Sequence, residues 1–475
     1  MMAEKILCKM VLIIALLFCL CLSGCGTGES GGPSGKQDNM TVGSGTQSGQ
    51  EEPPQASTSG QYIPEGREVI TLGTFWEVEA WSPISRAVNK FNMAQKDYFV
   101  QIERCSLERF LLDIVRKQGA DIYNLSLGGV NRDIMVEKGI FEDLTPWLEN
   151  SDAVGREDIV DAVWRAGSRD DKLYFLIPSF HCQGILVEKG HTNEGAWSGK
   201  DFLELGRKYP GGRLTENIKG STSSLMVSHL KCYMDAFVDW EDLTCSFDSD
   251  EFVTLLEDMK YFSDYNYEAV DDSATIAELI HNKVYLTGWV NIVMEHGMYS
   301  YRDIKEVFGD DYEIAGVPTA DGSLKYSLTP SQIYGMNALS EHKEGAWAFF
   351  EYLLTEYLIE CLQEKVGYEF PARKDILERE LQGYIDYVHP DTDTRVYYHT
   401  NQYSRERMER TPEGFTEEDK QAVLHIIDNS YSASLGNDRI RYILQEETEP
   451  FFKGHKTAEE VAKIIQSRVS LYLLE

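Results

Sequence analysis

Basic side chains are scarce in this chain of 475 residues. It has 45 Lys and Arg against 78 Asp and Glu, which gives a net charge of −33 at pH 7. Binding to nucleic acid depends on a basic surface that neutralises the phosphates. We therefore expect no nucleic-acid partner. The aromatic share of 11% must serve a core or a binding surface for another class of ligand.

Cysteines are few and scattered. Four of the nine lie within the first 25 residues, and the others are Cys105, Cys182, Cys232, Cys245 and Cys361. An odd number of dispersed thiols excludes a disulfide framework, although Cys232 and Cys245 are near enough in sequence to pair. No CxxC or Cys/His spacing suggests zinc, and the acidic run 239–258 lacks the spacing of an EF-hand loop. We expect neither a metal nor a cofactor.

The sequence also lacks a hydrophobic run long enough to stay in a membrane as a helix. The apolar run from Met10 to Leu22 has 13 residues, whereas a spanning helix needs about 20. Two lysines precede this run and Leu-Ser-Gly-Cys25 ends it, as in an export signal. These last four residues resemble a bacterial lipobox. The resemblance implies that residues 1–24 are a lipoprotein signal peptide and that Cys25 carries lipid on the extracytoplasmic face of the cell membrane.

Residues 25–67 are rich in Gly and Ser, with Gln, Thr and Pro between them. This composition is typical of a flexible, solvated linker. We expect a tether that separates the lipidated Cys25 from the folded part of the chain.

Beyond the tether, the hydrophobic pattern alternates between strand and helix. Strands are predicted at 68–76, 98–102 and 120–125, and helices at 84–92 and 107–118. This alternation predicts a parallel sheet covered by helices. Ligands of such sheets bind beyond the carboxyl ends of the strands. The segments after Phe75 and after Tyr123 are therefore candidates for a binding site.

Later segments extend this pattern. Residues 171–187 predict a hairpin-like pair of strands, or an extended passage that crosses between two lobes. Near the end of the chain, Thr457-Ala-Glu-Glu460 has the form of a capping box, and apolar residues then recur at helical spacing. We predict a terminal helix that starts at this box.

Four pieces of the sequence together resemble the family 1 extracellular solute-binding proteins of bacterial ABC importers, the group that includes maltose-binding-type proteins. The pieces are 119–122 with 139–147, Lys172-Leu-Tyr-Phe-Leu-Ile-Pro178, 312–318 with 334–354, and the closing segment 457–469. The resemblance covers residues 68–475. It implies the α/β type II periplasmic-binding-protein fold, in which two α/β lobes are joined by crossing strands. The N-terminal lobe would be 68–177 and 328–372, and the C-terminal lobe 178–327 and 373–475.

The first candidate ligand contacts follow the predicted strands of the first lobe. Trp76 ends the first strand, and Glu77 and Trp81 lie in the same loop, while Asn124 and Ser126 follow the third strand. An indole face offers apolar area to a sugar ring, and a carboxylate accepts hydrogen bonds from its hydroxyls. Packing of Trp76 in the core and backbone capping by Asn124 and Ser126 are the alternative interpretations.

The resemblance implies further contacts near the lobe crossings. Ser179 and Phe180 follow the first crossing at Pro178, Tyr334 marks the return crossing, Trp289 resembles the tryptophan of the second lobe's cleft, and Arg373 follows Phe-Pro-Ala. These positions complete the expected ligand-binding set. All of them are aromatic, polar or cationic side chains suited to a hydroxylated solute.

The resemblance implies a monomeric, membrane-anchored protein that captures a small solute, expected to be a mono- or oligosaccharide, and delivers it to an ABC permease without catalysis. Two alternatives remain. A surface-anchored glycan hydrolase would need two carboxylates about 5 to 10 Å apart, and no HExxH or P-loop pattern favours another chemistry. A sensor component that reports ligand occupancy to a membrane receptor would have the same sequence features.

Overall fold

The protein is described from a computed structural model. The chain divides into two units, Met1–Ser57 and Thr58–Glu475. The structure describes parts of the second unit: residues 64–80, 82–126, 130–208, 213–215, 223, 230–240, 242–262, 285–292, 301, 311–364, 369–386, 395–398, 407–410, 415–432 and 438–474. The predicted signal peptide, Cys25, nearly all of the tether and Trp81 lie outside these residues.

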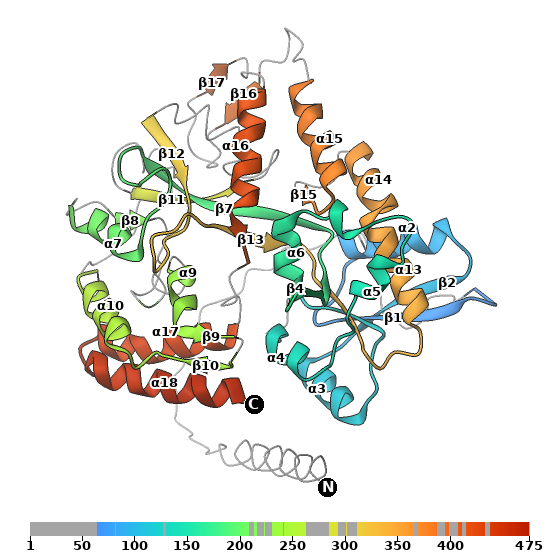
Figure 1. The fold of residues 1–475 in the computed structure, drawn as a ribbon, viewed down its shortest axis with the longest axis horizontal. Helices are drawn as coiled ribbons and strands as arrows, with labels where there is room; N and C mark the ends of the chain where they lie inside the picture. Colours follow the sequence, from blue (N-terminus) through green and yellow to red (C-terminus); the bar gives the residue numbers. More distant parts are fainter. Residues whose placement is uncertain are drawn as a thin grey trace, which may run out of the picture. The chain divides into compact units, whose positions relative to one another are not determined.

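The first sheet has five strands in the order β2-β1-β3-β14-β6. Figure 1 labels its first two strands, β1 and β2. Their bounds are β1 Glu68–Thr74, β2 Tyr98–Arg104, β3 Ile122–Asn124, β6 Phe175–Leu176 and β14 Tyr334–Met336. The first three strands are parallel, as the sequence predicts, whereas β14 is antiparallel to β3 and to β6. A strand from late in the chain therefore lies inside a sheet built by the early strands.

Helices flank this sheet. They are α2 Pro83–Ala94, α3 Leu107–Arg116, α4 Arg132–Glu137, α5 Thr145–Glu149, α6 Asp161–Gly167, α13 Lys343–Leu354 and α14 Glu356–Glu364, with a 3-10 turn at Arg156–Asp158. The two predicted early helices are confirmed as α2 and α3. Ser82 accepts a hydrogen bond from the Ser85 backbone N–H, and Pro83 fits the first helical turn, which has no intrahelical acceptor for its nitrogen. These local signals explain where α2 begins.

The second sheet is built around one long strand, β7. The path β18-β13-β7-β11-β8 is extended by β12 and β15, which also pair with β7. Bounds are β7 Ser179–Glu188, β8 Arg213–Thr215, β11 Tyr285–Ile292, β12 Tyr312–Ala315, β13 Tyr326–Pro330, β15 Phe370–Pro371 and β18 Ser430–Tyr431. Gly184 lies at the crowded centre of β7, where an added Cβ would come within 2.8 Å of the Ala315 carbonyl oxygen. Only glycine fits this close approach.

The remaining elements are helices and short strand pairs. The helices are α7 Gly199–Lys208, α9 Lys231–Met234, α10 Asp250–Lys260, α15 Lys374–Ile385, α16 Glu417–Asp428, α17 Asp438–Phe452 and α18 Ala458–Leu474, with a 3-10 turn at Asp235–Phe237. The strand pairs are β4 Ser168–Arg169 with β5 Lys172–Leu173, β9 Val238–Asp239 with β10 Thr244–Cys245, and β16 Arg395–Tyr398 with β17 Arg407–Arg410. The predicted capping box of α18 is confirmed, because Thr457 and Glu460 each accept a hydrogen bond from the other's backbone N–H.

The chain crosses between the two sheets next to Pro178. Strand β6 belongs to the first sheet and β7 to the second, so residues 171–187 form a crossing and not a hairpin. Two backbone hydrogen bonds secure this passage, from Ser331 N to Ser179 O at 3.0 Å and from Ala372 N to Pro178 O at 2.9 Å. The two predicted α/β layers joined by crossing strands are therefore confirmed.

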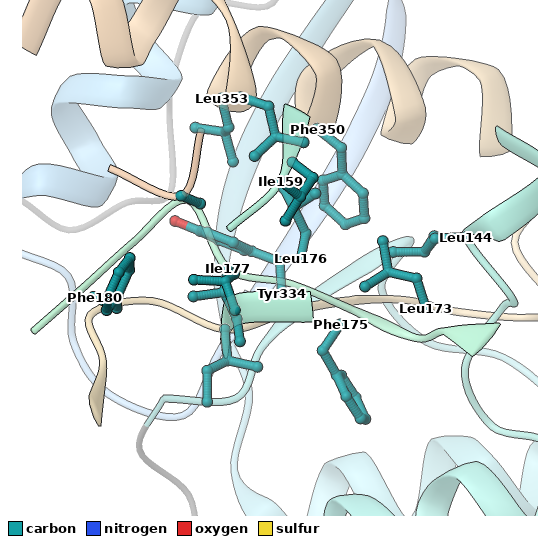
Figure 2. Packing of buried hydrophobic residues seen from close by; sticks show 14 of the residues in the cluster. Leu144, Ile159, Leu173, Phe175, Leu176, Ile177, Phe180, Tyr334, Phe350 and Leu353 are labelled. Carbon is teal, nitrogen blue, oxygen red and sulfur yellow. The ribbon is translucent and has the colours of Figure 1, made fainter. Parts of the chain in front are cut away.

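Two hydrophobic clusters lie under these sheets. The first extends from the five-stranded sheet through the crossing, and Figure 2 shows Tyr334 there with Ile177, Leu176 and Phe350. It also includes Leu377 and other side chains of α15 and α16, from a stretch that the sequence assigned to the C-terminal lobe. The second cluster contains side chains of α7, α10, α17 and α18. The exact lobe boundaries stay a prediction.

The described residues contain no helix that is both long and apolar enough to cross a bilayer. Within the same part of the chain, no three His, Cys, Asp or Glu side chains are arranged to hold a metal ion. Cys245 is a free thiol whose Sγ lies 3.3 Å from Ser470 Oγ and 3.5 Å from Gln466 Oε1. Cys245 therefore forms no disulfide in this structure, and the side chain of Cys232 lies outside the described part of the chain.

Candidate functional site

Strand register brings four chain segments to one edge of the first sheet. Thr74 at the end of β1 pairs with Asn124 at the end of β3. Tyr334, the first residue of β14, pairs with Asn124 on one side and with Leu176 of β6 on the other. The segments that follow β1, β3 and β6, and the one that precedes β14, therefore start at the same edge. Trp76, the Asn124 to Ser126 segment and Ser179 all belong to it, as the sequence predicts for a ligand site.

Asn124 and Ser126 tie this edge to the return crossing. Asn124 Nδ2 donates to Gln332 Oε1 at 2.6 Å, and its Oδ1 accepts from Ser126 N at 3.0 Å. Ser126 Oγ in turn accepts from Ile333 N at 2.9 Å. Asn124 is fully buried, so its amide is committed to holding the crossing. Ser126 is partly buried and also serves the crossing through its hydroxyl.

Phe180 and Tyr334 lie in the core beneath this edge. Phe180 is 0% exposed and Tyr334 is 2% exposed. The Tyr334 ring packs against Phe349 and Phe350, and the Phe180 ring lies 5.8 Å from that of Phe370. Figure 2 labels Phe180, Tyr334 and Phe350 in this core. Burial raises the pKa of the Tyr334 hydroxyl, although a hydrogen bond with Asn124 acts in the opposite direction. In this structure neither ring offers surface to a solute, so both support the site from below.

Trp76 and Glu77 lie in the segment after β1. Trp76 is partly buried against the first hydrophobic cluster, and its carbonyl accepts a hydrogen bond from Thr74 Oγ1 at 3.0 Å. The Glu77 side chain is 77% exposed and lies 4.0 Å from Arg104 Nη1. The pair therefore combines a partly accessible indole with a solvated carboxylate, which are the two groups that the sequence predicts for sugar contact.

Ser179 and Arg373 already have partners within the protein. Ser179 Oγ donates to Glu369 Oε2 at 3.1 Å. Arg373 donates to both carboxylate oxygens of Asp375 at 2.9 Å, and its side chain is 14% exposed. A bidentate pair of this kind neutralises the guanidinium. Arg373 therefore has fewer hydrogen-bond donors free for a solute than its sequence position suggests. Glu369 is a further carboxylate at the crossing, and the sequence did not predict it.

The backbone pairing of β11 with β7 gives the position of Trp289 in the second sheet. It lies on β11 opposite Ile185 of β7, and β11 ends three pairs later with Ile292 opposite Cys182. Since Cys182 is near the start of β7, the carboxyl end of β11 lies next to the crossing. The Trp289 side chain and the whole of Trp81 are outside the described residues, so their ligand roles stay predictions.

A second group of polar residues lies near α4. Asn131 begins this helix by accepting a hydrogen bond from Ile134 N through Oδ1. The Arg132 guanidinium carbon lies 5.8 Å from the centre of the Phe175 ring. Burial lowers the pKa of Arg132, while Asp133 acts in the opposite direction.

Arg169 connects α4 to the part of the chain beyond the crossing. It donates from Nη1 to Asp133 O at 2.9 Å and from Nη2 to Trp240 O at 3.3 Å. Its position follows from the β4–β5 hairpin, whose turn residues Asp170 and Asp171 both have positive φ. This is the geometry of a tight two-residue turn. Trp240 lies between β9 and β10, so Arg169 joins two elements far apart in sequence.

The sequence did not indicate the roles of Asn131, Arg132 and Arg169. The sequence marks the segment after Tyr123 as a candidate site, and the contacts predicted there end at Ser126. Nothing in the local sequence distinguishes Arg132 from an ordinary surface arginine, because its aromatic neighbour, Phe175, is far from it in sequence. The available signal was the rule that ligands bind beyond the carboxyl ends of parallel strands. The sequence prediction followed the segment after β3 only as far as Ser126, and Asn131 and Arg132 lie further along it.

These features define a known fold. Two α/β sheets, joined by crossing strands and with a late antiparallel strand inside the first sheet, form the type II periplasmic-binding-protein fold of ABC-transporter solute-binding proteins.

Solved structures share this fold at low sequence identity. The sugar-binding protein MalE from Xanthomonas citri matches with a TM-score of 0.54 and 12% identity, over 86% of this chain and 97% of that one. A family 1 extracellular solute-binding protein from Bifidobacterium longum subsp. infantis gives 0.51 and 12%, over 85% and 99%. An ABC-transporter solute-binding protein from Thermotoga lettingae, bound with α-D-tagatose, gives 0.50 and 15%, over 86% and 100%. No protein-family model and no curated protein matches the sequence.

The hydrogen bonds of Asn124 predict a structural role. We expect Asn124→Ala to lower the free energy of unfolding by about 2 kcal/mol, because it leaves buried partners unsatisfied. Urea denaturation measures this loss. The control is Gln421→Ala, which removes an exposed amide bonded to Glu417 and should change stability by less than about 0.5 kcal/mol. Equal stability of the two variants would contradict the role given to Asn124.

Proposed function

We propose that this protein is a monomeric, non-catalytic solute-binding protein that captures a small carbohydrate between its two lobes and delivers it to an ABC permease. The observation that carries the proposal is the crossing at Pro178, where the ligand edge of the first sheet meets the start of β7. A solute at this edge touches elements on either side of the crossing.

Carbohydrate is the favoured solute class. The partly accessible indole of Trp76 and the exposed carboxylate of Glu77 follow the same strand. Trp289 lies on β11, whose carboxyl end runs toward the crossing in the second sheet. Aromatic faces and hydroxyl-binding carboxylates are the groups that bind sugar rings. Solved proteins with this fold include the sugar-binding protein MalE and a protein bound with α-D-tagatose.

The mechanism is closure of the two lobes around the solute. A ligand shifts a conformational equilibrium only by its difference in affinity for the two states. Contact with elements of both lobes exists only in the closed state, so the solute favours closure. A shift from 1% to 99% closed requires an affinity ratio of about 10⁴. The permease then recognises the closed, loaded form.

Saccharide binding is tested with the mature chain, residues 25–475, in a thermal-shift panel of mono- and oligosaccharides. A sugar at 100 times its Kd should stabilise the folded state by about 2.7 kcal/mol. Trp289→Ala should weaken binding of that sugar about tenfold, which is about 1.4 kcal/mol.

The matched control is Tyr442→Ala, which removes an aromatic ring on α17 that is 57% exposed. It should leave affinity unchanged. Unchanged affinity in Trp289→Ala would remove Trp289 from the site. A panel in which only non-sugar solutes bind would contradict the carbohydrate class, and hydrolysed sugar in the incubations would contradict binding without catalysis.

Membrane anchoring is proposed to depend on Cys25. Two or three acyl chains on this residue hold a protein at a bilayer without a spanning helix. We expect wild-type protein in the membrane fraction, with the mass of the acyl chains present in intact-protein mass spectrometry. Cys25→Ala, with the signal region otherwise intact, should lose that lipid mass. A wild-type protein whose mass shows no acyl chain would contradict the anchor.

A further inference from the structure

Two adjacent side chains near the proposed site carry buried donors without acceptors. Asn131 is 6% exposed, and its Oδ1 accepts from Ile134 N at 3.0 Å, which fixes the orientation of the amide. Its Nδ2 is buried and has no hydrogen-bond partner among the described residues. In the same part of the chain, Nη1 of Arg132 is also buried and without an acceptor.

Such groups are costly. A buried donor that loses its water and gains no acceptor destabilises the folded state, and a charged donor does so more strongly. Most buried polar atoms of folded proteins are paired, so two unpaired donors on neighbouring residues need a specific explanation. A ligand that supplies the acceptors is such an explanation.

These donors lie where parts from both sides of the crossing meet. Phe175, beneath the Arg132 guanidinium, is on β6, the strand that leads into the crossing. Arg169 links the α4 backbone to the carbonyl of Trp240 in the β9–β10 loop. Figure 1 shows α4 and β4 on the side of the first sheet toward β9 and β10. Trp240 itself contributes a third buried donor, Nε1, that lacks a partner among the described residues.

The charge state of the arginines points to Arg132. Arg169 is already paired, because Glu137 lies 3.3 Å and Asp170 3.9 Å from its guanidinium nitrogens. Arg132 has the neighbouring Asp133 as its charged partner, yet its Nη1 is buried without an acceptor. A cationic donor in this position favours an anionic acceptor.

The chemistry of the three donors narrows the ligand group. Guanidinium, amide NH2 and indole N–H groups only donate hydrogen bonds, whereas a sugar hydroxyl must also donate to be satisfied. An ionised carboxylate only accepts, and it binds guanidinium groups strongly. We propose that the solute carries a carboxylate that Arg132 and Asn131 bind, which makes it an acidic saccharide of the uronate class. This inference rests on the proposed carbohydrate function.

The test compares Arg132→Met with wild type in the mature chain, because methionine keeps apolar contact with Phe175 and removes the charge. The control is Arg156→Met. Arg156 also lies over an aromatic ring, that of Trp164, but it is paired with Asp161 and partly exposed. Thermal melting is measured without ligand, and calorimetry measures affinity for matched probes. The probes are glucuronate and glucose, galacturonate and galactose, trigalacturonate and galactotriose, and the non-sugar carboxylates citrate and succinate.

We expect at least one acidic saccharide to bind wild type about tenfold or more tightly than its neutral partner. Arg132→Met should abolish that preference and leave the ligand-free melting temperature equal to or above that of wild type, because an uncompensated buried charge is removed. Arg156→Met should keep the preference.

The inference is overturned if neutral saccharides bind as tightly as acidic ones, if no carboxylate binds, or if Arg132→Met melts well below both wild type and Arg156→Met. Binding of citrate or succinate through Arg132, with no saccharide bound, would support the carboxylate and contradict the carbohydrate proposal. Equal binding of neutral and acidic saccharides would support the carbohydrate proposal and contradict the carboxylate.

Discussion

Two backbone hydrogen bonds at the crossing hold the arrangement on which the rest of the structure depends. The carbonyls of Pro178 and Ser179 accept from Ala372 N and Ser331 N. These two hydrogen bonds join residues 178–179, between β6 and β7, to the distant segments that contain Ser331 and Ala372. Because Tyr334 pairs with both Asn124 and Leu176, the same point also fixes the edge of the first sheet. A shift of one residue here would turn Phe180 out of the core.

Polar side chains near the crossing divide into two groups. Asn124, Ser126 and Ser179 are bonded within the protein and keep the passage in place. Asn131 and Arg132 carry donors that the described residues leave unpaired. The first group stabilises the fold, whereas the second costs stability in the ligand-free protein. This division agrees with the proposed binding function, in which a rigid crossing positions groups whose partners arrive with the solute.

Local signals in the sequence predicted much of this fold. The parallel strands β1 to β3, the helices α2 and α3, and the capping box of α18 follow from short-range patterns and are confirmed. The insertion of β14 between β3 and β6 joins residues far apart in the chain, and only the family resemblance indicated it. Asn124 and Gln332, for example, are 208 residues apart.

The candidate site was less accessible to prediction. Strand ends indicate a candidate edge of the sheet. Alternate residues of a strand face opposite sides, so Phe180 and Tyr334 could not be assigned to the core or to the site without the register. Arg373 was a candidate from its place after Phe-Pro-Ala, yet its neighbour Asp375 occupies the guanidinium. Arg132 packs over Phe175, 43 residues further along the chain, and no local pattern reveals this contact.

The central claim is that a solute at this edge draws the two lobes together. Small-angle X-ray scattering of the mature chain, with and without a saturating solute, measures this directly, since the tether contributes equally to both states. The account predicts a smaller radius of gyration in the loaded protein. An unchanged radius in a protein that calorimetry shows to be saturated would contradict it.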